Sequence, residues 1–258
     1  MKRLHTGITC LDEIIEGGYP EGRTLLILGT TGSGKTILGV SFIQQACSEG
    51  RKSMIIATEE LPEDIIIQSE SVGKPLQEYY INGTLIIDKV YEERSIYEKE
   101  LKDIGIEGFD KLQTNILGLL EKIPDEVECV LIDNLGVFTL NMSPNEFRGQ
   151  FDSLILGLTK RNITAIIIMD LSADDRTENI ASYSVYGVIR ALIKDNPFTG
   201  VRERLIEILK MRNTPSGNRD IAFQSHFDLY QDSEYLHKIY LLRSHCRGTP
   251  HQELASLD

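Results

Sequence analysis

The sequence predicts an α/β fold in which a mostly parallel sheet is flanked by helices and ends in a C-terminal antiparallel hairpin. Two observations support this expectation. Apolar, β-branched runs alternate with longer segments of helical period, which is typical of βαβ units. No internal repeat, low-complexity tract or Pro/Gly-rich linker divides the 258 residues, and a domain of that length can bury a full hydrophobic core.

The expected strands are short runs rich in Val, Ile and Leu. In chain order they cover residues 24–28, 53–58, 84–88, 129–133, 163–170, 182–193, 203–211 and 221–229. Turn-forming residues at 213–218 separate the last two runs. We therefore expect these two runs to form an antiparallel hairpin at the edge of the sheet.

Helices are expected where apolar residues recur at helical spacing. They cover residues 35–49, 109–123 and 144–161, and a further helix begins near Pro62. A proline suits a first helical turn, and the acidic Glu63 and Asp64 suit the positive end of the helix dipole. The charge-rich residues 91–108 are expected to form a surface excursion.

The composition excludes several classes of protein. The chain has 27 Lys and Arg against 39 Asp and Glu, which gives a net charge of −12 and argues against a general nucleic-acid or membrane-surface role. The longest apolar run, near residues 163–169, is far shorter than the roughly 20 residues of a membrane span. No secretory signal is apparent, and the four cysteines are scattered. These features predict a cytoplasmic protein with reduced thiols and no membrane insertion.

A glycine-rich loop carries the strongest chemical signal. It has the full GxxxxGK[ST] pattern and reads Gly29-Thr30-Thr31-Gly32-Ser33-Gly34-Lys35-Thr36. Its glycines let backbone N–H groups turn toward phosphate oxygens, and the following helix adds its positive N-terminal end. We expect Lys35 to bind the β- and γ-phosphates and the Thr36 hydroxyl to coordinate Mg²⁺. The loop lies between an expected strand and an expected helix, so the sequence predicts binding of a nucleotide, with Mg²⁺ at Thr36.

Two aspartates close apolar strands. Asp133 ends the run CVLID, where a carboxylate at the carboxyl end of a parallel strand can hold Mg²⁺ or its water. Asp170 ends a later run with the same pattern and is the weaker candidate. The alternative for both is an ordinary aspartate at a strand end. Given the phosphate loop, we favour Asp133 as the acid linked to the metal.

Two adjacent glutamates follow the strand SMIIAT directly. Glu59 or Glu60 is a candidate to orient and deprotonate the attacking water, and neighbouring acids raise each other's pKa. The alternative is a solvated acidic corner before a helix. Spacing alone does not separate these two interpretations.

Two basic residues lie two apart near the end of the run ERLIEILKMR. The side chains of Lys210 and Arg212 leave the same face of a strand and could reach a γ-phosphate in a neighbouring subunit. Spacing alone favours a solvated pair that protects a sheet edge. Three further residues, His245, Cys246 and His251, are too few for a zinc site.

With these residues in place, the chain resembles the KaiC-like branch of the RecA-type ATPases, from about residue 3 to about residue 230. The resemblance begins ahead of the phosphate loop and continues through three later strands. The segments that carry it are TGITCLD at 6–12, GG at 17–18, PEG at 20–22, ATEE at 57–60, VLIDN at 130–134 and LKMRNT at 209–214.

The resemblance implies a RecA-like core that assembles as a homo-oligomeric ring, often a hexamer, with ATP bound between subunits. It also implies that Glu59 and Glu60 are the paired catalytic glutamates, and that Lys210 and Arg212 act across the subunit boundary. The chain departs from the family pattern after residue 169, at 186–189 and at Ser216, and it has one phosphate loop. These departures suggest slow or differently coupled hydrolysis.

We therefore expect residues 1–230 to form the ATPase domain and residues 231–258 to form a C-terminal extension, helical and part of the same unit. The expected activity is slow, Mg²⁺-dependent ATP hydrolysis in a regulatory role with an unidentified partner protein. Three alternatives remain: a nucleotide-sensing scaffold with little turnover, a recombinase-like DNA-dependent ATPase, and a small-molecule kinase.

Overall fold

A computed structural model describes residues 1–90, 116–139, 142–171, 175–195, 202–214 and 220–223. These residues all belong to one compact unit, Met1–Ser225. The expected surface excursion, the expected extension at 231–258 and the end of the last expected strand lie outside the described residues. Within them, no helix is long and apolar enough to cross a membrane.

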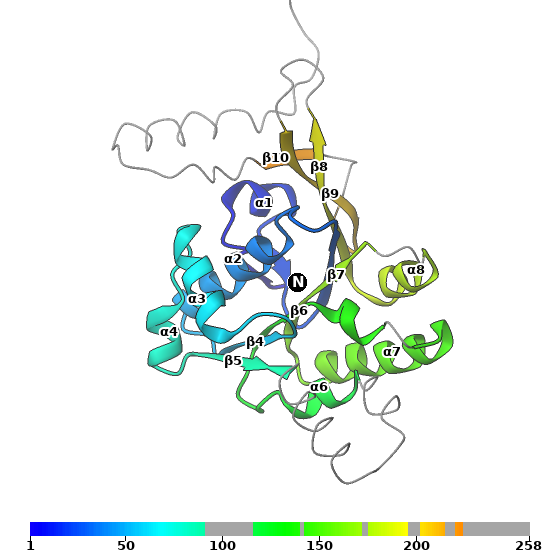
Figure 1. The fold of residues 1–258 in the computed structure, drawn as a ribbon, viewed down its shortest axis with the longest axis horizontal. Coiled ribbons are helices and arrows are strands. Elements are labelled where there is room, and N and C mark those ends of the chain that lie inside the picture. Colours follow the sequence, from blue (N-terminus) through cyan, green and yellow to red (C-terminus); the bar gives the residue numbers. More distant parts are fainter. Residues whose placement is uncertain (91–115, 140–141, 172–174, 196–201, 215–219, 224–258) are drawn as a thin grey trace, which may run out of the picture. The chain divides into compact units, whose positions relative to one another are not determined.

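Eight of the described strands form one sheet, with the order β10–β9–β8–β3–β7–β6–β4–β5 (Figure 1). The strands from β8 to β5 run parallel to one another, and β9 and β10 add antiparallel pairs at one edge. Their bounds are β3 Thr24–Gly29, β4 Ser53–Ala57, β5 Leu85–Lys89, β6 Cys129–Asp133, β7 Thr164–Asp170, β8 Gly187–Asp195, β9 Arg202–Met211 and β10 Asp220–Phe223. A separate ribbon pairs β1 (Arg3–Leu4) with β2 (Tyr19–Pro20).

Helices cover both faces of the sheet. One face carries α1 (Thr9–Ile14), α2 (Lys35–Ser48), α3 (Pro62–Ser71) and α4 (Gln77–Ile81), and the other carries α6 (Gly118–Glu121), the 3-10 helix η2 (Leu135–Phe138), α7 (Pro144–Lys160) and α8 (Asp175–Ser184) (Figure 1). The two faces bury separate apolar clusters, because successive side chains of a strand point to opposite sides. In β3, for example, Leu25 and Ile27 belong to one cluster and Leu26 and Leu28 to the other.

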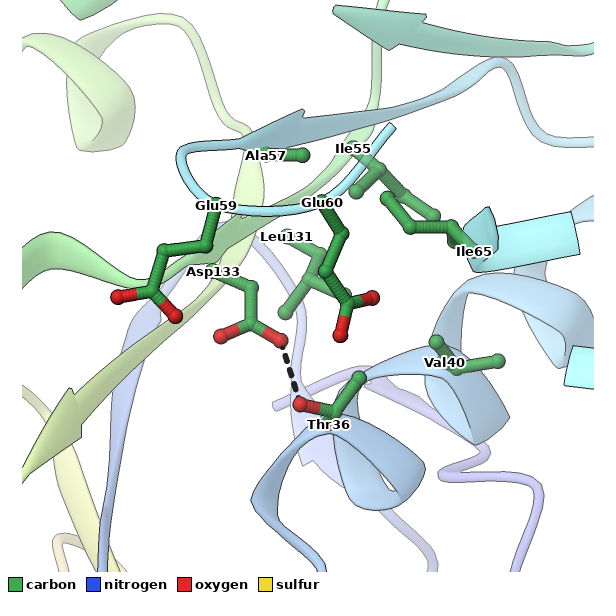
Figure 2. Close-up of a pocket in the computed structure, with 9 residues that line it drawn as sticks. All are labelled: Thr36, Val40, Ile55, Ala57, Glu59, Glu60, Ile65, Leu131 and Asp133. Carbon is green, nitrogen blue, oxygen red and sulfur yellow. Dashed lines mark hydrogen bonds between the residues drawn. The ribbon is translucent and has the colours of Figure 1, made fainter. Parts of the chain in front are cut away.

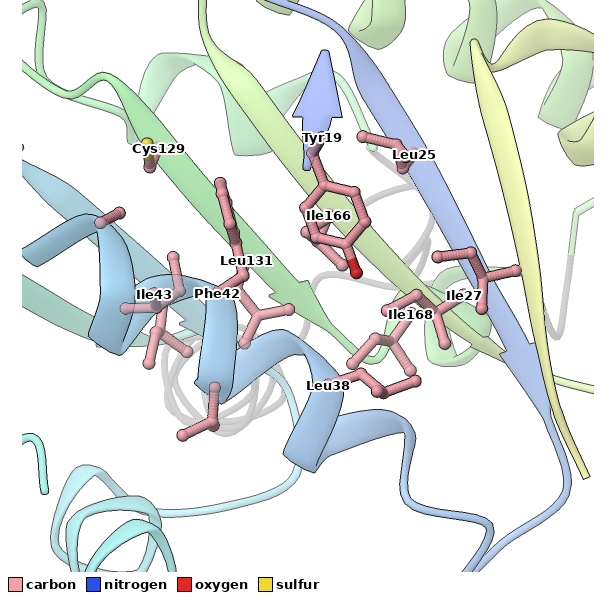
Figure 3. Packing of buried hydrophobic residues seen from close by; sticks show 14 of the residues in the cluster. Tyr19, Leu25, Ile27, Leu38, Phe42, Ile43, Cys129, Leu131, Ile166 and Ile168 are labelled. Atoms are coloured by element: carbon pink, nitrogen blue, oxygen red, sulfur yellow. The ribbon is translucent and has the colours of Figure 1, made fainter. Parts of the chain in front are cut away.

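Helix α2 packs closely on the centre of the sheet. Its side chains Leu38 and Phe42 face Leu131 and Ile168 of the strands beneath (Figure 3). A Cβ atom at Gly39 would lie only 2.5 Å from a methyl group of Leu131. Glycine at this position therefore permits the close approach that fixes the start of α2 against β6.

The structure confirms the predicted fold class and most predicted elements. The prediction of a strand beginning at Ser182 is wrong, because residues 182–184 form the end of α8 and β8 begins at Gly187. The physical reason is a long-range contact: Lys210 of β9 donates hydrogen bonds to the terminal carbonyl groups of α8. The ribbon β1–β2, the helices α1, α4 and α8 and the 3-10 helix η2 were not among the predicted elements.

Candidate nucleotide-binding site

The glycine-rich loop joins the end of β3 to the start of α2. Gly34 precedes α2 with a φ of 97°, and Gly32 has a φ of 78°. Both values lie in the left-handed region that glycine adopts without strain. Gly34 has no side chain to cap the helix, so the backbone N–H groups of the first turn are left for an anion.

The Lys35 side chain lies beside this loop and is 8% exposed. Its ammonium group donates to the carbonyl oxygen of Thr30 at 2.9 Å and pairs with Asp170 Oδ1 at 2.6 Å. Thr30 belongs to the loop, and Asp170 ends β7, which pairs with β3. The ammonium group is therefore held at the carboxyl ends of the two central strands.

Thr36 and Asp133 meet directly. The Thr36 hydroxyl donates to Asp133 Oδ2 at 2.7 Å (Figure 2). Burial raises the pKa of Asp133 to about 6, the Thr36 hydrogen bond opposes this shift, and the negative charge of Glu60 adds to it. A hydroxyl and a carboxylate placed together are the hard oxygen ligands that Mg²⁺ prefers.

Glu59 and Glu60 lie at the mouth of a pocket beside Asp133. Figure 2 shows both carboxylates directed toward the part of the pocket where Thr36 and Asp133 lie, and the negative charge of each raises the pKa of Asp133. Most of the other lining side chains are apolar. The lining residues are Thr36, Val40, Ile55, Ala57, Glu59, Glu60, Ile65, Leu131 and Asp133. Two carboxylates at the mouth of a partly apolar pocket can accept a proton from water beside the loop.

Asn134 and Asp170 form a hydrogen-bonded link that sequence reasoning did not foresee. The Asn134 side-chain amide donates to Asp170 Oδ2. Its own oxygen accepts from the Gly136 N–H at 2.8 Å, and its backbone N–H donates to Thr58 Oγ1 at 2.9 Å. Asn134 follows β6 and Asp170 ends β7, which is the neighbouring parallel strand. A polar residue at the carboxyl end of each strand is the signal that could have marked them.

Lys210 and Arg212 lie away from Lys35, at the antiparallel edge. The Lys210 ammonium group donates to the carbonyl oxygens of Ser182, Tyr183 and Val185 at 2.8–3.2 Å, and Arg212 donates to that of Tyr183 at 3.3 Å. Burial lowers the pKa of Lys210, and the Arg212 charge lowers it further. Two cations therefore stabilise the negative end of α8.

Arg204 is a further basic residue that sequence reasoning missed. Its Nε atom donates to the carbonyl oxygen of Gly32 at 3.1 Å, so β9 contacts the glycine-rich loop. This contact depends on the sheet order β9–β8–β3, in which residues far apart in sequence become neighbours. No local pattern around residue 204 marks it.

The loop fits a nucleotide phosphate, and the adjacent oxygens fit Mg²⁺. Ser33 Oγ is buried and has no hydrogen-bond partner among the described residues, and Lys35 uses two of its three donors. Across the described ranges, no group of three or more His, Cys, Asp or Glu side chains could hold a metal ion. The Thr36 hydroxyl and the Asp133 carboxylate are the side-chain oxygens beside the loop that could share Mg²⁺ with phosphate oxygens.

The fold and this loop define the chain as a RecA-type phosphate-loop protein. More narrowly, the chain belongs to the KaiC ATPase family, whose model matches residues 4–225. The family supports ATP binding and hydrolysis in general terms.

Relatives of two lengths resemble the chain. The circadian clock protein KaiC2 of Synechocystis is 28% identical over 221 residues, which cover 84% of this chain and 38% of the relative. The chain thus spans less than half the length of such clock proteins. A UPF0273 protein of Methanopyrus kandleri is 26% identical, with 87% of this chain and 89% of the relative covered.

A solved structure has the same fold. The KaiC-like protein of Pyrococcus horikoshii matches with a TM-score of 0.66 and 23% identity, over 86% of this chain and 94% of that one. This likeness supports the fold described above.

Proposed function

We propose that this chain binds MgATP and hydrolyses it slowly at the subunit interfaces of a homo-oligomeric ring. The family resemblance implies that such a ring is often a hexamer. The observation that carries this proposal is the joint placement of Lys35, Thr36 and Asp133. A buried ammonium group, a hydroxyl and a carboxylate lie around one glycine-rich loop. Phosphoryl transfer depends mainly on positioning and charge, and these three groups supply both.

In this proposal each described residue has a separate task. The backbone of residues 29–34 and the Lys35 ammonium group bind the phosphates, and Arg204 adds positive charge at Gly32. Thr36 and Asp133 hold Mg²⁺, which neutralises charge on the phosphates when bound. Glu59 or Glu60 accepts a proton from the attacking water. A general base of this kind contributes about 10²–10⁴-fold to a rate.

We further propose that Lys210 and Arg212 complete the site of the neighbouring subunit. Arg212 is exposed and lies just beyond the end of β9. A cation supplied in this way offsets charge that develops on the transferred phosphate. A repeated contact of one face with a different face forms a ring when the rotation between subunits closes.

Two features support slow turnover and a regulatory role. The positive charge of Lys35 is partly offset by Asp170, and matched relatives are named as circadian clock proteins. We therefore propose that hydrolysis serves a regulatory partner protein. The buried thiols of Cys47 and Cys129 are unpaired, which fits the reducing cytoplasm that we propose as its compartment.

A mixing experiment tests the shared site. We expect Glu59→Gln/Glu60→Gln and Arg212→Ala to be inactive in phosphate release when each is measured alone. In an equal mixture, about a quarter of the ring interfaces combine intact carboxylates from one chain with an intact Arg212 from the other. Turnover should therefore return to about a quarter of the wild-type value.

A matched mixture provides the control. Combining Glu59→Gln/Glu60→Gln with Lys35→Ala restores no activity, because Lys35 and the glutamates belong to the same subunit's site. Absence of recovery in the first mixture would contradict the shared interface. ATP binding and assembly without phosphate release in the wild type would favour the second candidate, a nucleotide-sensing scaffold, which the Lys35–Asp170 ion pair also favours.

A further inference from the structure

The proposed function assigns Asp170 no contact with the nucleotide or with the metal. Its Oδ1 atom lies 2.6 Å from the Lys35 ammonium group, and the Asp170 side chain is 43% exposed. The ammonium group that is proposed to bind phosphate is thus already paired with a carboxylate of the same chain. The inference below rests on the proposed nucleotide site.

The Asp170 carboxylate is held in place from two directions. Backbone pairing of β3 with β7 puts Gly29 opposite Asp170, and the Leu171 N–H donates to the Gly29 carbonyl oxygen at 3.1 Å. The second carboxylate oxygen accepts from Asn134, which is buried and itself fixed by Gly136. Asp170 therefore cannot turn away from Lys35 without breaking these side-chain contacts.

The Lys35 ammonium group holds a bound phosphate close to the Asp170 carboxylate, because the phosphate and the carboxylate both contact that ammonium group. A phosphate oxygen that accepts from the Lys35 ammonium group lies about 2.8 Å from it. While the ion pair persists, that oxygen is within about 5.4 Å of Asp170 Oδ1. If the ion pair instead opens, nucleotide binding must include the loss of a charge-assisted hydrogen bond. In both cases the carboxylate opposes phosphate binding.

The opposition grows with the charge of the nucleotide. A triphosphate carries one more phosphate than a diphosphate, and Lys35 is expected to contact that terminal group. Repulsion between like charges at this separation is weakened by solvent on the exposed side of Asp170, yet it acts more strongly on ATP than on ADP. An uncharged side chain of the same shape would remove this difference.

We propose that Asp170 sets the preference of the site between nucleoside triphosphate and diphosphate, by reducing the affinity for ATP relative to ADP. Asp170 is a specificity-determining residue that acts through its charge and through Lys35. ADP consequently competes more effectively with ATP than it would at the phosphate loop alone, and the exchange of bound ADP for ATP becomes less favourable.

Equilibrium binding of ADP and of a non-hydrolysable ATP analogue, each with Mg²⁺, tests the inference on the full chain. For Asp170→Asn, we expect the ratio of ATP-analogue affinity to ADP affinity to rise by about tenfold. The matched control is Asp125→Asn, which removes a carboxylate before the start of β6, at the opposite end of the parallel strands. Its ratio should equal that of the wild type.

Salt provides a readout that a purely structural role of Asp170 would not change. Raising the salt concentration should move the wild-type ratio toward that of Asp170→Asn, because screening weakens the repulsion. If the wild type binds both nucleotides and the ratio is unchanged in Asp170→Asn, this inference is overturned and the proposed function stands. A selective loss of ATP affinity would also overturn the inference and would assign Asp170 to the metal instead. Failure of the wild type to bind either nucleotide would overturn the proposed function and this inference with it.

Discussion

The chain presents its two groups of basic residues in different ways. Lys35 is buried at the centre of the parallel sheet, and its partners Thr30 and Asp170 come from the loop and from the adjacent strand. Lys210 and Arg212 lie at the antiparallel edge, where they bind the terminal carbonyl groups of α8. Folding of one subunit fixes the first group beside the glycine-rich loop. Folding leaves the second group, Lys210 and Arg212, near the surface, and its contacts with another subunit would form only on assembly.

The largest expected effect comes from the central group. Lys35→Ala removes the ammonium group from the loop, and we expect a loss of nucleotide affinity of at least about 100-fold, the size of a charge-assisted contact in a buried site. Calorimetric titration with ADP measures this effect. Lys160→Ala, at the exposed end of α7, is the matched control. Tight binding by Lys35→Ala would contradict the assignment of the loop.

The edge group is expected to affect turnover and leave binding to one subunit intact. For Arg212→Ala, we expect phosphate release to fall by at least about tenfold, because a cation that offsets developing charge is lost. ADP affinity measured at low protein concentration should stay within about twofold of the wild type. Equal losses of binding and turnover would remove the distinction between the two groups.

In the central region, the Asp133 carboxylate is expected to lower the stability of the chain and to support its function. Its pKa lies at about 6 in the folded chain against an ordinary value of 3.8, so the folded chain binds more protons between these pH values. The free energy of unfolding therefore falls as the pH rises from about 4 to about 6. At pH 7 the buried carboxylate costs about 3 kcal/mol.

Asp133→Asn should accordingly raise the melting temperature of the nucleotide-free chain by a few degrees at pH 7 and by much less at pH 4. The same substitution should weaken Mg²⁺-dependent ATP binding. Thermal unfolding at the two pH values checks the first effect, with Asp125→Asn as the exposed control. Destabilisation of equal size at both pH values would contradict the burial argument.

The smallest expected effect tests how closely α2 packs on the sheet. Gly39→Ala introduces a Cβ atom 2.5 Å from Leu131, and we expect a net destabilisation of about 1 kcal/mol after the gain in helix propensity. Gly149→Ala is the matched substitution in α7, where no atom lies within 4 Å of the new Cβ. It should stabilise the chain by about 0.5 kcal/mol. Urea unfolding measures the free energy of unfolding of both variants and distinguishes the opposite signs. Equal changes in the two variants would show that α2 is not closely packed.

The sequence predicted the parts of the molecule that local pattern encodes. Apolar runs and helical spacing located β3, α2 and β6, and glycine spacing located the loop. The predicted strand start at Ser182 was wrong because Lys210, from a distant strand, supplies the cation at the end of α8. The ion pair of Lys35 with Asp170 could not be predicted either, since it depends on which strand lies beside β3. The roles assigned to Glu59 and the other site residues stay predictions.

The position of β3 in the sheet also governs when the glycine-rich loop can take its shape during synthesis. This strand pairs only with β7 and β8 within the described chain, and those strands begin at Thr164 and Gly187. At roughly 5–20 residues per second, a ribosome reaches them many seconds after it has made Thr24–Gly29. A nascent chain that ends before β7 carries the whole loop sequence without either neighbour of the strand that supports it. Phosphate binding should therefore be among the last properties that the growing chain acquires.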